Sequence, residues 1–203
     1  MKLYLIRHGE TDLNKQKRLQ GKLDIELNDY GRKLAHMTAA GLKDVEFHIA
    51  FTSPLKRAKE TAQIIIGNRN IPLIEETRIA EIGFGVYEGH CYEGENCDIS
   101  DSEFINFFQH PERYCPPENG ETFEEIIERT GAFWNELISS REYENKTILI
   151  ATHGCALKAI LANANHIPVA KIWGESLNKN CAVTILDVKN GQVRIEEEGK
   201  TFY

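Results

Sequence analysis

Residues able to bind and attack a phosphoryl group follow three predicted strands of this chain. They are Arg7, His8 and Gly9 after the run 2–6, Ser53 and Arg57 at and after the end of the run 47–53, and His153 and Gly154 after the run 147–152. In a parallel sheet the carboxyl ends of the strands meet at one edge, where ligands bind. Guanidinium groups match phosphate oxygens bidentately and stay charged at any working pH. The pattern therefore predicts a phosphoryl site at this edge.

A histidine at such a site can act as a nucleophile. A neutral imidazole attacks phosphorus and forms a phosphohistidine, which divides one difficult step into two. One ring nitrogen must be unprotonated, and a hydrogen bond from the other nitrogen to a backbone carbonyl aims it. We expect Gly9 and Gly154 to let the backbone approach the phosphate closely. Glu81, after a third predicted strand, can give the leaving oxygen its proton.

Each of these residues has an ordinary explanation when it is taken singly. A lone histidine at a strand end is usually a core or rim residue, and Arg57 can be a surface residue. Glu81 can cap a helix or pair with Arg78. Their joint occurrence at strand ends favours the catalytic interpretation.

The elements that must position these residues alternate between strand and helix. Asn28 is the predicted N-cap of one helix, and Ser53 is that of another with Pro54 at its first position. The alternation predicts a three-layer α/β/α domain over residues 1–203 with a mainly parallel central sheet, and an irregular lid over 83–120. The predicted strands are 2–6, 47–53, 71–76 and 147–152, and the predicted helices are 28–41, 53–66, 121–143 and 155–166. A predicted hairpin over 181–198 turns at Asn190 and Gly191.

Composition excludes several classes of protein. Of the 203 residues, 41% are hydrophobic and 27% are charged, which are globular values, and the net charge of −7 disfavours a nucleic-acid binder. No apolar run approaches the roughly 18 to 20 residues that cross a bilayer. The first residues, MKLYLIRHGE, lack the pattern of a secretory signal, so we expect a cytoplasmic protein.

The cysteines predict reduced thiols. Their number is odd, they are scattered, and no CxxC pair occurs. A zinc site built from His90 and three of the cysteines would lack the close pair of ligands that such sites usually have, so no metal is expected. The five cysteines are Cys91, Cys97, Cys115, Cys155 and Cys181.

Five segments together resemble a known family. "LIRHGETDLN", "SPLKRAKETA", "RIAEIGFGVYEG", "GETFEEIIER" and "ATHGCALKAIL" occur in this order with suitable spacing. The chain resembles the histidine phosphatase superfamily, which includes the cofactor-dependent phosphoglycerate mutases and their phosphatase relatives. The match extends from Leu5 to about Val188, and RHGET with a later HG after an apolar strand is a specific signature.

The resemblance implies a role for each matching residue. His8 would be the phosphorylated nucleophile, Glu81 the acid that later activates water, and His153 a hydrogen-bonding partner of the phosphoryl oxygens. Arg7 and Arg57 would join this catalytic set because they hold the same oxygens. No metal and no organic cofactor is implied. The expected substrate-binding residues are Arg7, Asn14, Gln20, Gly21, Arg57 and Gly154.

Three positions depart from the family's usual pattern. Cys155 stands where many relatives have a small residue, Lys158 where an arginine is common, and Asn28 where threonine is usual. None of the three belongs to the catalytic set, so the expected activity is unchanged.

The lid favours a phosphatase over a mutase. In phosphoglycerate mutases the region equivalent to 82–120 resembles "ERHYG" and adds basic residues that hold a bisphosphate, whereas this chain has "EGHCYEG". The lid carries one arginine, Arg113. Its acids can simply form a solvated face, but the lack of cations argues against a bisphosphate ligand. The lid carboxylates are Glu88, Glu93, Glu95, Asp98, Asp101, Glu103, Glu112 and Glu118.

Two further alternatives stay open beside the phosphatase. One is the mutase, and the other is a non-catalytic phospho-ligand-binding relative, which would be expected to lack His8, Arg57 or His153. The predicted partner is a small phosphate ester, and neither the natural substrate nor a homodimer is readable from the sequence. The lid aromatics either face a ring-containing substrate or pack the lid onto the body. They are Phe84, Tyr87, Tyr92, Phe104, Phe107 and Phe108.

Overall fold

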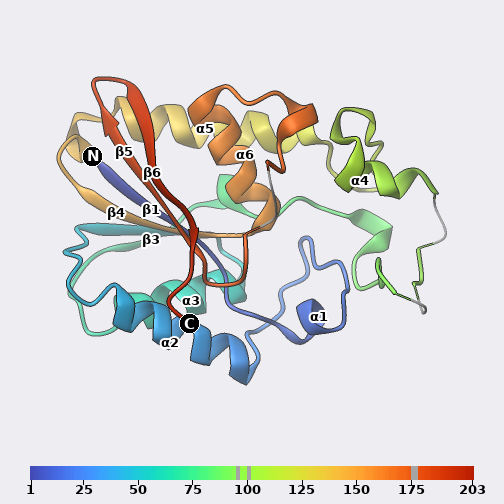
Figure 1. Ribbon diagram of the computed structural model, residues 1–203, viewed down its shortest axis with the longest axis horizontal. Helices are drawn as coiled ribbons and strands as arrows, with labels where there is room; N and C mark the ends of the chain where they lie inside the picture. Colours follow the sequence, from blue (N-terminus) through green and yellow to red (C-terminus); the bar gives the residue numbers. More distant parts are fainter. Residues whose placement is uncertain (95–96, 100–101, 175–177) are drawn as a thin grey trace.

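The site is carried by a mixed sheet of six strands within the described part of the chain. The computed structural model describes residues 1–94, 97–99, 102–174 and 178–203. The strand order is β3-β2-β4-β1-β5-β6, in which the first four are mutually parallel, β5 is antiparallel to β1, and β6 is antiparallel to β5 (Figure 1). The strands are β1 Lys2–Arg7, β2 Ile49–Thr52, β3 Leu73–Glu75, β4 Thr147–Thr152, β5 Val183–Lys189 and β6 Gln192–Lys200.

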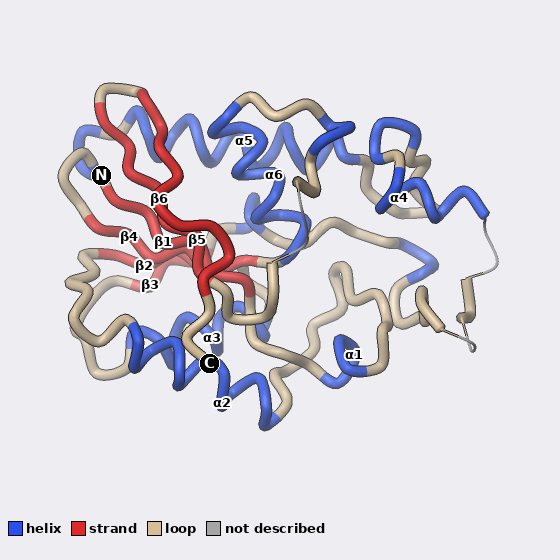
Figure 2. The backbone as a smooth tube through the Cα atoms, viewed as in Figure 1, coloured by secondary structure: helices blue, strands red, loops and turns tan. Residues whose placement is uncertain are grey.

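Helices cover both faces of this sheet. Figure 2 shows α5 and α6 on one face and α2 and α3 on the other, while α1 and α4 lie beyond the sheet. The predicted three-layer α/β fold is therefore confirmed. Among the described residues, no helix has the length and apolar character needed to cross a membrane. The helices are α1 Asp12–Lys15, α2 Asp29–Gly41, α3 Lys56–Ile66, α4 Asn106–Gln109, α5 Phe123–Ser139 and α6 Gly154–Asn165.

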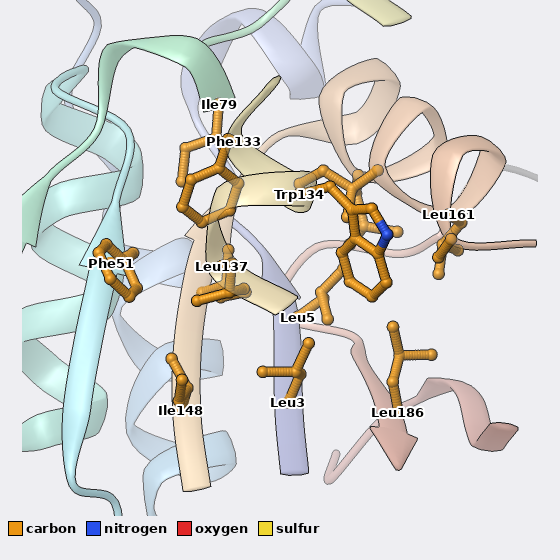
Figure 3. Close-up of a cluster of buried hydrophobic side chains, with 14 of the residues drawn as sticks. Leu3, Leu5, Phe51, Ile79, Phe133, Trp134, Leu137, Ile148, Leu161 and Leu186 are labelled. Atoms are coloured by element: carbon orange, nitrogen blue, oxygen red, sulfur yellow. The ribbon is translucent and has the colours of Figure 1, made fainter. Parts of the chain in front are cut away.

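The central strands are buried on both faces, which explains their continuous apolar sequences. Alternate residues of a strand point to opposite faces. Leu3 and Leu5 accordingly pack with Trp134 and Leu137 of α5 (Figure 3), whereas the intervening residues of β1 join a second cluster on the face of α2 and α3. This packing fixes β1 and thereby fixes the place where it ends.

Two of the predicted local features are confirmed, and one is wrong. Asn28 caps α2 by accepting a hydrogen bond from Gly31 N, and positive φ angles of 51° and 75° at Asn190 and Gly191 form the hairpin turn. Ser53, however, does not cap α3. The helix starts at Lys56, two residues later than predicted, and the Ser53 hydroxyl instead contacts His153 at the site described below.

The segment 83–120 is irregular, as predicted, and packs onto the body of the protein. Within its described residues are α4 and three short 3₁₀ turns. Phe107 is buried at its centre, with its ring centroid 5.1 Å from Phe123 of α5 and 5.1 Å from Trp173, which follows α6. Aromatic packing against two helical regions therefore holds this segment over the carboxyl edge of the sheet.

Candidate active site

The register of the sheet brings the two site histidines together. β1 pairs with β4 so that Arg7 lies opposite Thr152, and His8 N donates to Thr152 O over 2.9 Å. His8 and His153 are therefore the next residues on adjacent parallel strands. Their ring centroids are 5.1 Å apart.

The ring of His8 is fixed in a single orientation. Its Nδ1 lies 2.7 Å from Gly9 O, and because a carbonyl only accepts, Nδ1 carries the proton and Nε2 presents a lone pair. Only 2% of the residue is exposed. Burial, followed by the charges of Arg57 and Arg7, lowers the pKa of His8 well below its ordinary value. The ring is therefore neutral at physiological pH.

Arg7 and Arg57 are held by main-chain carbonyls, and no carboxylate of the described residues lies in hydrogen-bond range of either. Arg7 Nη1 donates to Asn178 O over 2.6 Å, and Arg57 donates to Leu23 O and Gly21 O over 2.7 and 2.8 Å. The Nε atoms of both arginines are buried without a hydrogen-bond partner in the described part of the chain. Burial lowers the pKa of Arg57 to about 10, so the guanidinium stays charged at neutral pH. Two fixed cations with spare donors match the needs of a phosphoryl dianion.

Ser53 orients His153, a contact that the sequence pattern did not predict. Ser53 Oγ lies 2.7 Å from His153 Nε2, and it also accepts a hydrogen bond from Leu55 N over 3.3 Å. A hydroxyl that accepts from Leu55 is free to donate to Nε2, which leaves the proton of His153 on Nδ1. That Nδ1 is buried and has no hydrogen-bond partner among the described residues. Burial is the first cause that lowers the pKa of His153 well below its ordinary value.

Glu81 lies at the start of α6. Its carboxylate accepts hydrogen bonds from Cys155 N over 3.3 Å and from Ala156 N over 3.0 Å, so it occupies the helix N-terminus, where acceptors are needed. It does not pair with Arg78, which binds other carboxylates. Arg129 of α5 donates to three carbonyls of the segment 78–81, including Glu81 O. These bonds set the backbone from which Glu81 reaches the cavity.

The remaining predicted residues line the same cavity, which has a volume of about 80 Å³. Asn14 Oδ1 accepts from Thr11 N, so its amide N–H₂ is the group it can offer to a phosphate. Gln20 Oε1 accepts from Thr11 Oγ1 over 3.0 Å. Gly21 has a φ of 47°, and a Cβ there would lie 2.1 Å from Glu88 Oε1. The cavity thus collects His8, Glu81, Arg7 and Arg57 together with Asn14, Gln20, Gly21 and Gly154, while His153 is fully buried next to His8 and does not itself line the cavity.

The comparisons with known proteins agree with this geometry. A family model described as the histidine phosphatase superfamily (branch 1) matches residues 3–201. The chain belongs to this superfamily. The resemblance noted in the sequence is thereby confirmed, and the chain is a phosphomonoesterase of the histidine phosphatase family.

Three relatives show how close the similarity is. The chain is 38% identical over 157 residues to the uncharacterised phosphatase PhoE of Bacillus subtilis, covering 77% of this chain and 74% of that protein. It is 29% identical over 173 residues to phosphoserine phosphatase 1 of Hydrogenobacter thermophilus, covering 85% and 80%. The solved structure of Bacillus stearothermophilus YhfR matches with a TM-score of 0.90 at 34% identity, covering 98% and 97%.

The outer wall of the cavity in this histidine phosphatase is largely apolar. Phe84, Tyr92, Phe107 and Phe108 line it, so some of the lid aromatics face the cavity while Phe104 is buried and only packs. Phe84 and Phe107 are themselves buried, so they both line the cavity and pack the lid onto the body. Three further wall residues were missed because they stand outside the recognised motifs. They are Arg18, Leu19 and Trp173. Cys155, which follows Gly154 within a recognised motif, also lines the wall.

Gly9 has a different role from the one expected. It does not line the cavity, and a Cβ on it would lie 2.7 Å from Gly31 O of α2. Its N–H donates to Thr61 Oγ1 of α3 over 3.0 Å. Gly9 therefore permits close packing against α2. It does not create space for a phosphate, because it is not part of the cavity wall.

None of the described lid acids lines the cavity, in agreement with a solvated face. Glu93, Asp98, Glu112 and Glu118 are exposed, and Glu88 instead accepts hydrogen bonds from the Lys22 and Phe84 amides. Glu95 and Asp101 lie outside the described residues, as does the side chain of Glu103.

Two of the positions that depart from the family pattern, Cys155 and Lys158, are buried. Burial raises the pKa of the Cys155 thiol well above its ordinary value, which disfavours the thiolate. Lys158 forms an ion pair with Glu198 over 3.0 Å. All five cysteines are free, and the described residues contain no cluster of three or more ligands suited to a metal.

Proposed function

We propose that this chain hydrolyses small phosphomonoesters through a covalent phosphohistidine on His8. The observation that carries the proposal is the contact of Nδ1 with Gly9 O, which leaves Nε2 as a lone pair beside two buried arginines. A nucleophile that is neutral, fixed in one tautomer and next to fixed positive charge has what phosphoryl transfer requires.

In the first step, the Nε2–P bond forms while the ester P–O bond breaks. The leaving oxygen takes a proton from Glu81. The spare donors on Arg7 and Arg57 and the Nδ1–H of His153 bind the phosphoryl oxygens as their charge redistributes. The two arginines already line the cavity, so their donors need little reorganisation in the transition state.

In the second step, water attacks phosphorus and the N–P bond breaks. Glu81, now ionised, takes a proton from the water, and orthophosphate leaves. The amide hydrogen bonds from Cys155 and Ala156 hold the Glu81 carboxyl group in position for both steps. Glu81 thus returns to its protonated form for the next turnover.

Hydrolysis is favoured over mutase activity by the outer wall of the cavity. A mutase must hold a bisphosphate, which needs cations beyond those that bind the transferred phosphoryl group. Here the one further cation of the described wall is Arg18, which is paired with Asp98, and most of the rest of the wall beyond Arg7 and Arg57 is apolar. The same wall supports a substrate whose leaving group has a hydrophobic or ring portion.

We place the protein in the cytoplasm, in keeping with its free cysteines.

The test is a hydrolysis screen over aryl, nucleoside, sugar, glycerate and serine phosphates, run with wild-type protein and His8→Ala. We expect hydrolysis by the wild type, trapping of phosphate on the wild-type chain after an acid-free quench, and neither in His8→Ala. Full activity in that variant would overturn the mechanism. Interconversion of phosphoglycerates that depends on 2,3-bisphosphoglycerate would support the mutase instead, and much faster hydrolysis of sugar or glycerate phosphates would refute the ring-containing substrate.

A further inference from the structure

Arg18 is a positive charge on the lid side of the cavity. Its segment pairs with the lid: Leu19 N donates to His90 O, Tyr92 N donates to Lys17 O, and Arg18 lies opposite Cys91. In the described part of the chain, it is the one cation of the cavity wall apart from Arg7 and Arg57. It therefore lies where the leaving group of a bound phosphomonoester would be.

The charge of Arg18 is neutralised by a carboxylate that the backbone holds in place. Arg18 Nη1 donates to Gly89 O over 2.6 Å and to Asp98 Oδ2 over 3.2 Å. Asp98 Oδ2 also accepts from Cys91 N over 3.0 Å, and Asp98 N donates to Cys91 O over 3.0 Å. The amide of Cys91 is the first cause that holds the pKa of Asp98 below its ordinary value, so this carboxylate is ionised at neutral pH.

We propose that the Arg18–Asp98 pair selects substrates by charge, so that the enzyme favours phosphomonoesters whose leaving group carries no negative charge. This inference rests on the proposed phosphatase function and adds the substrate class. With Asp98 in place, the guanidinium offers no net positive charge to a carboxylate on the leaving group. The neighbouring wall is apolar, so a carboxylate would lose water there without gaining a partner.

A matched pair of substrates isolates this effect. 3-Phosphoglycerate and glycerol 3-phosphate differ only in having a carboxylate or a hydroxymethyl group at one end. The measured quantity is the ratio of their kcat/KM values, which cancels any change in the chemistry at His8. Asp98→Asn removes the charge but keeps an oxygen that accepts from Cys91 N, so the lid turn retains its anchor.

We expect Asp98→Asn to raise this ratio in favour of 3-phosphoglycerate by about fivefold, the factor that one unit-charge contact near 4 Å contributes in water. The double variant with Arg18→Met should lose that gain. Glu93→Gln is the control, because Glu93 is a lid acid that pairs with Lys17 outside the cavity wall, and it should keep the wild-type ratio.

The outcomes separate this inference from the function on which it rests. If Asp98→Asn leaves the ratio unchanged, or if the double variant keeps the increase, the selection by charge is refuted while hydrolysis stands. If neither substrate is hydrolysed by the wild type and the broader panel also fails, the proposed function is refuted. Thermal unfolding of each variant shows whether the lid has been disrupted. Asp98→Glu keeps the negative charge, so its ratio of kcat/KM values should stay close to that of the wild type.

Discussion

The two buried histidines predict how the free energy of unfolding depends on pH. Burial, followed by the charge of Arg57, lowers the pKa of His8 and His153 well below 6.5. The folded chain therefore keeps both rings neutral, whereas the unfolded chain protonates them as the pH falls below 6.5. Since the unfolded state then binds more protons, the folded state loses stability in this direction.

The size of the loss follows from the ordinary histidine pKa alone. Between pH 6.5 and pH 5.5, a ring that is protonated only in the unfolded chain costs the folded state about 1 kcal/mol. The two site histidines together therefore contribute about 2 kcal/mol. Carboxylates whose pKa is lowered in the folded state, such as Glu76 and Glu121, titrate below this range and do not contribute.

Urea unfolding at the two pH values and constant ionic strength measures this loss. His8→Gln and His153→Gln should each halve the wild-type difference, and the double variant should remove it, whatever each substitution does to stability at a single pH. His36→Asn, at an exposed position on α2, is the control and should keep the full difference. A wild-type protein equally stable at both pH values, or a double variant that still loses about 2 kcal/mol, would contradict the assignment.

Four further predictions follow from the site. Glu81→Gln should slow hydrolysis of alkyl phosphates by roughly 10²- to 10⁴-fold but that of p-nitrophenyl phosphate far less, because that leaving group needs no proton; equal losses would exclude Glu81 as the acid. Ser53→Ala should lower kcat by about tenfold with little change in KM, and Ser53→Thr should restore it, as expected for one hydrogen bond that orients His153. Orthophosphate at 100 times its dissociation constant should raise the free energy of unfolding by about 2.7 kcal/mol, and a flat titration would show that the site does not bind it. Activity should survive excess chelator because Arg7 and Arg57 supply the positive charge; loss that is reversed by added metal would refute this.

Short-range patterns predict the strands and most of the site. The apolar run of β1 must end where charged residues begin, and that boundary alone places Arg7 and His8 at the edge of the sheet. The Asn190–Gly191 turn is also predictable, because few residue pairs adopt positive φ at both positions. In each case the physical cause acts between residues a few positions apart.

Contacts between distant segments decide the features that sequence patterns mispredict or miss. Ser53 has the sequence context of an N-cap, but its hydroxyl meets His153, which is 100 positions away. Gly9 has the sequence context of a phosphate-binding loop, yet a larger residue is excluded there because its Cβ would collide with the backbone of α2. Trp173 joins the cavity wall by packing on Phe107. No local pattern encodes these pairings, since each depends on which strands and helices become neighbours.

The distribution of unsatisfied donors gives a physical reason for regarding this edge as the site. Arg7 Nε, Arg57 Nε and His153 Nδ1 are buried without a hydrogen-bond partner among the residues that the structure describes. Each such group costs a folded protein about 1 to 3 kcal/mol, so a sequence shaped by stability alone would pair or replace them. All three belong to residues gathered at the carboxyl ends of β1, β2 and β4, beside the lone pair of His8. A phosphoryl group has several oxygens that can accept from these donors at once. Hydrogen bonds from these donors to a substrate would therefore stabilise the bound state, and most strongly when the charge on the phosphoryl oxygens is greatest.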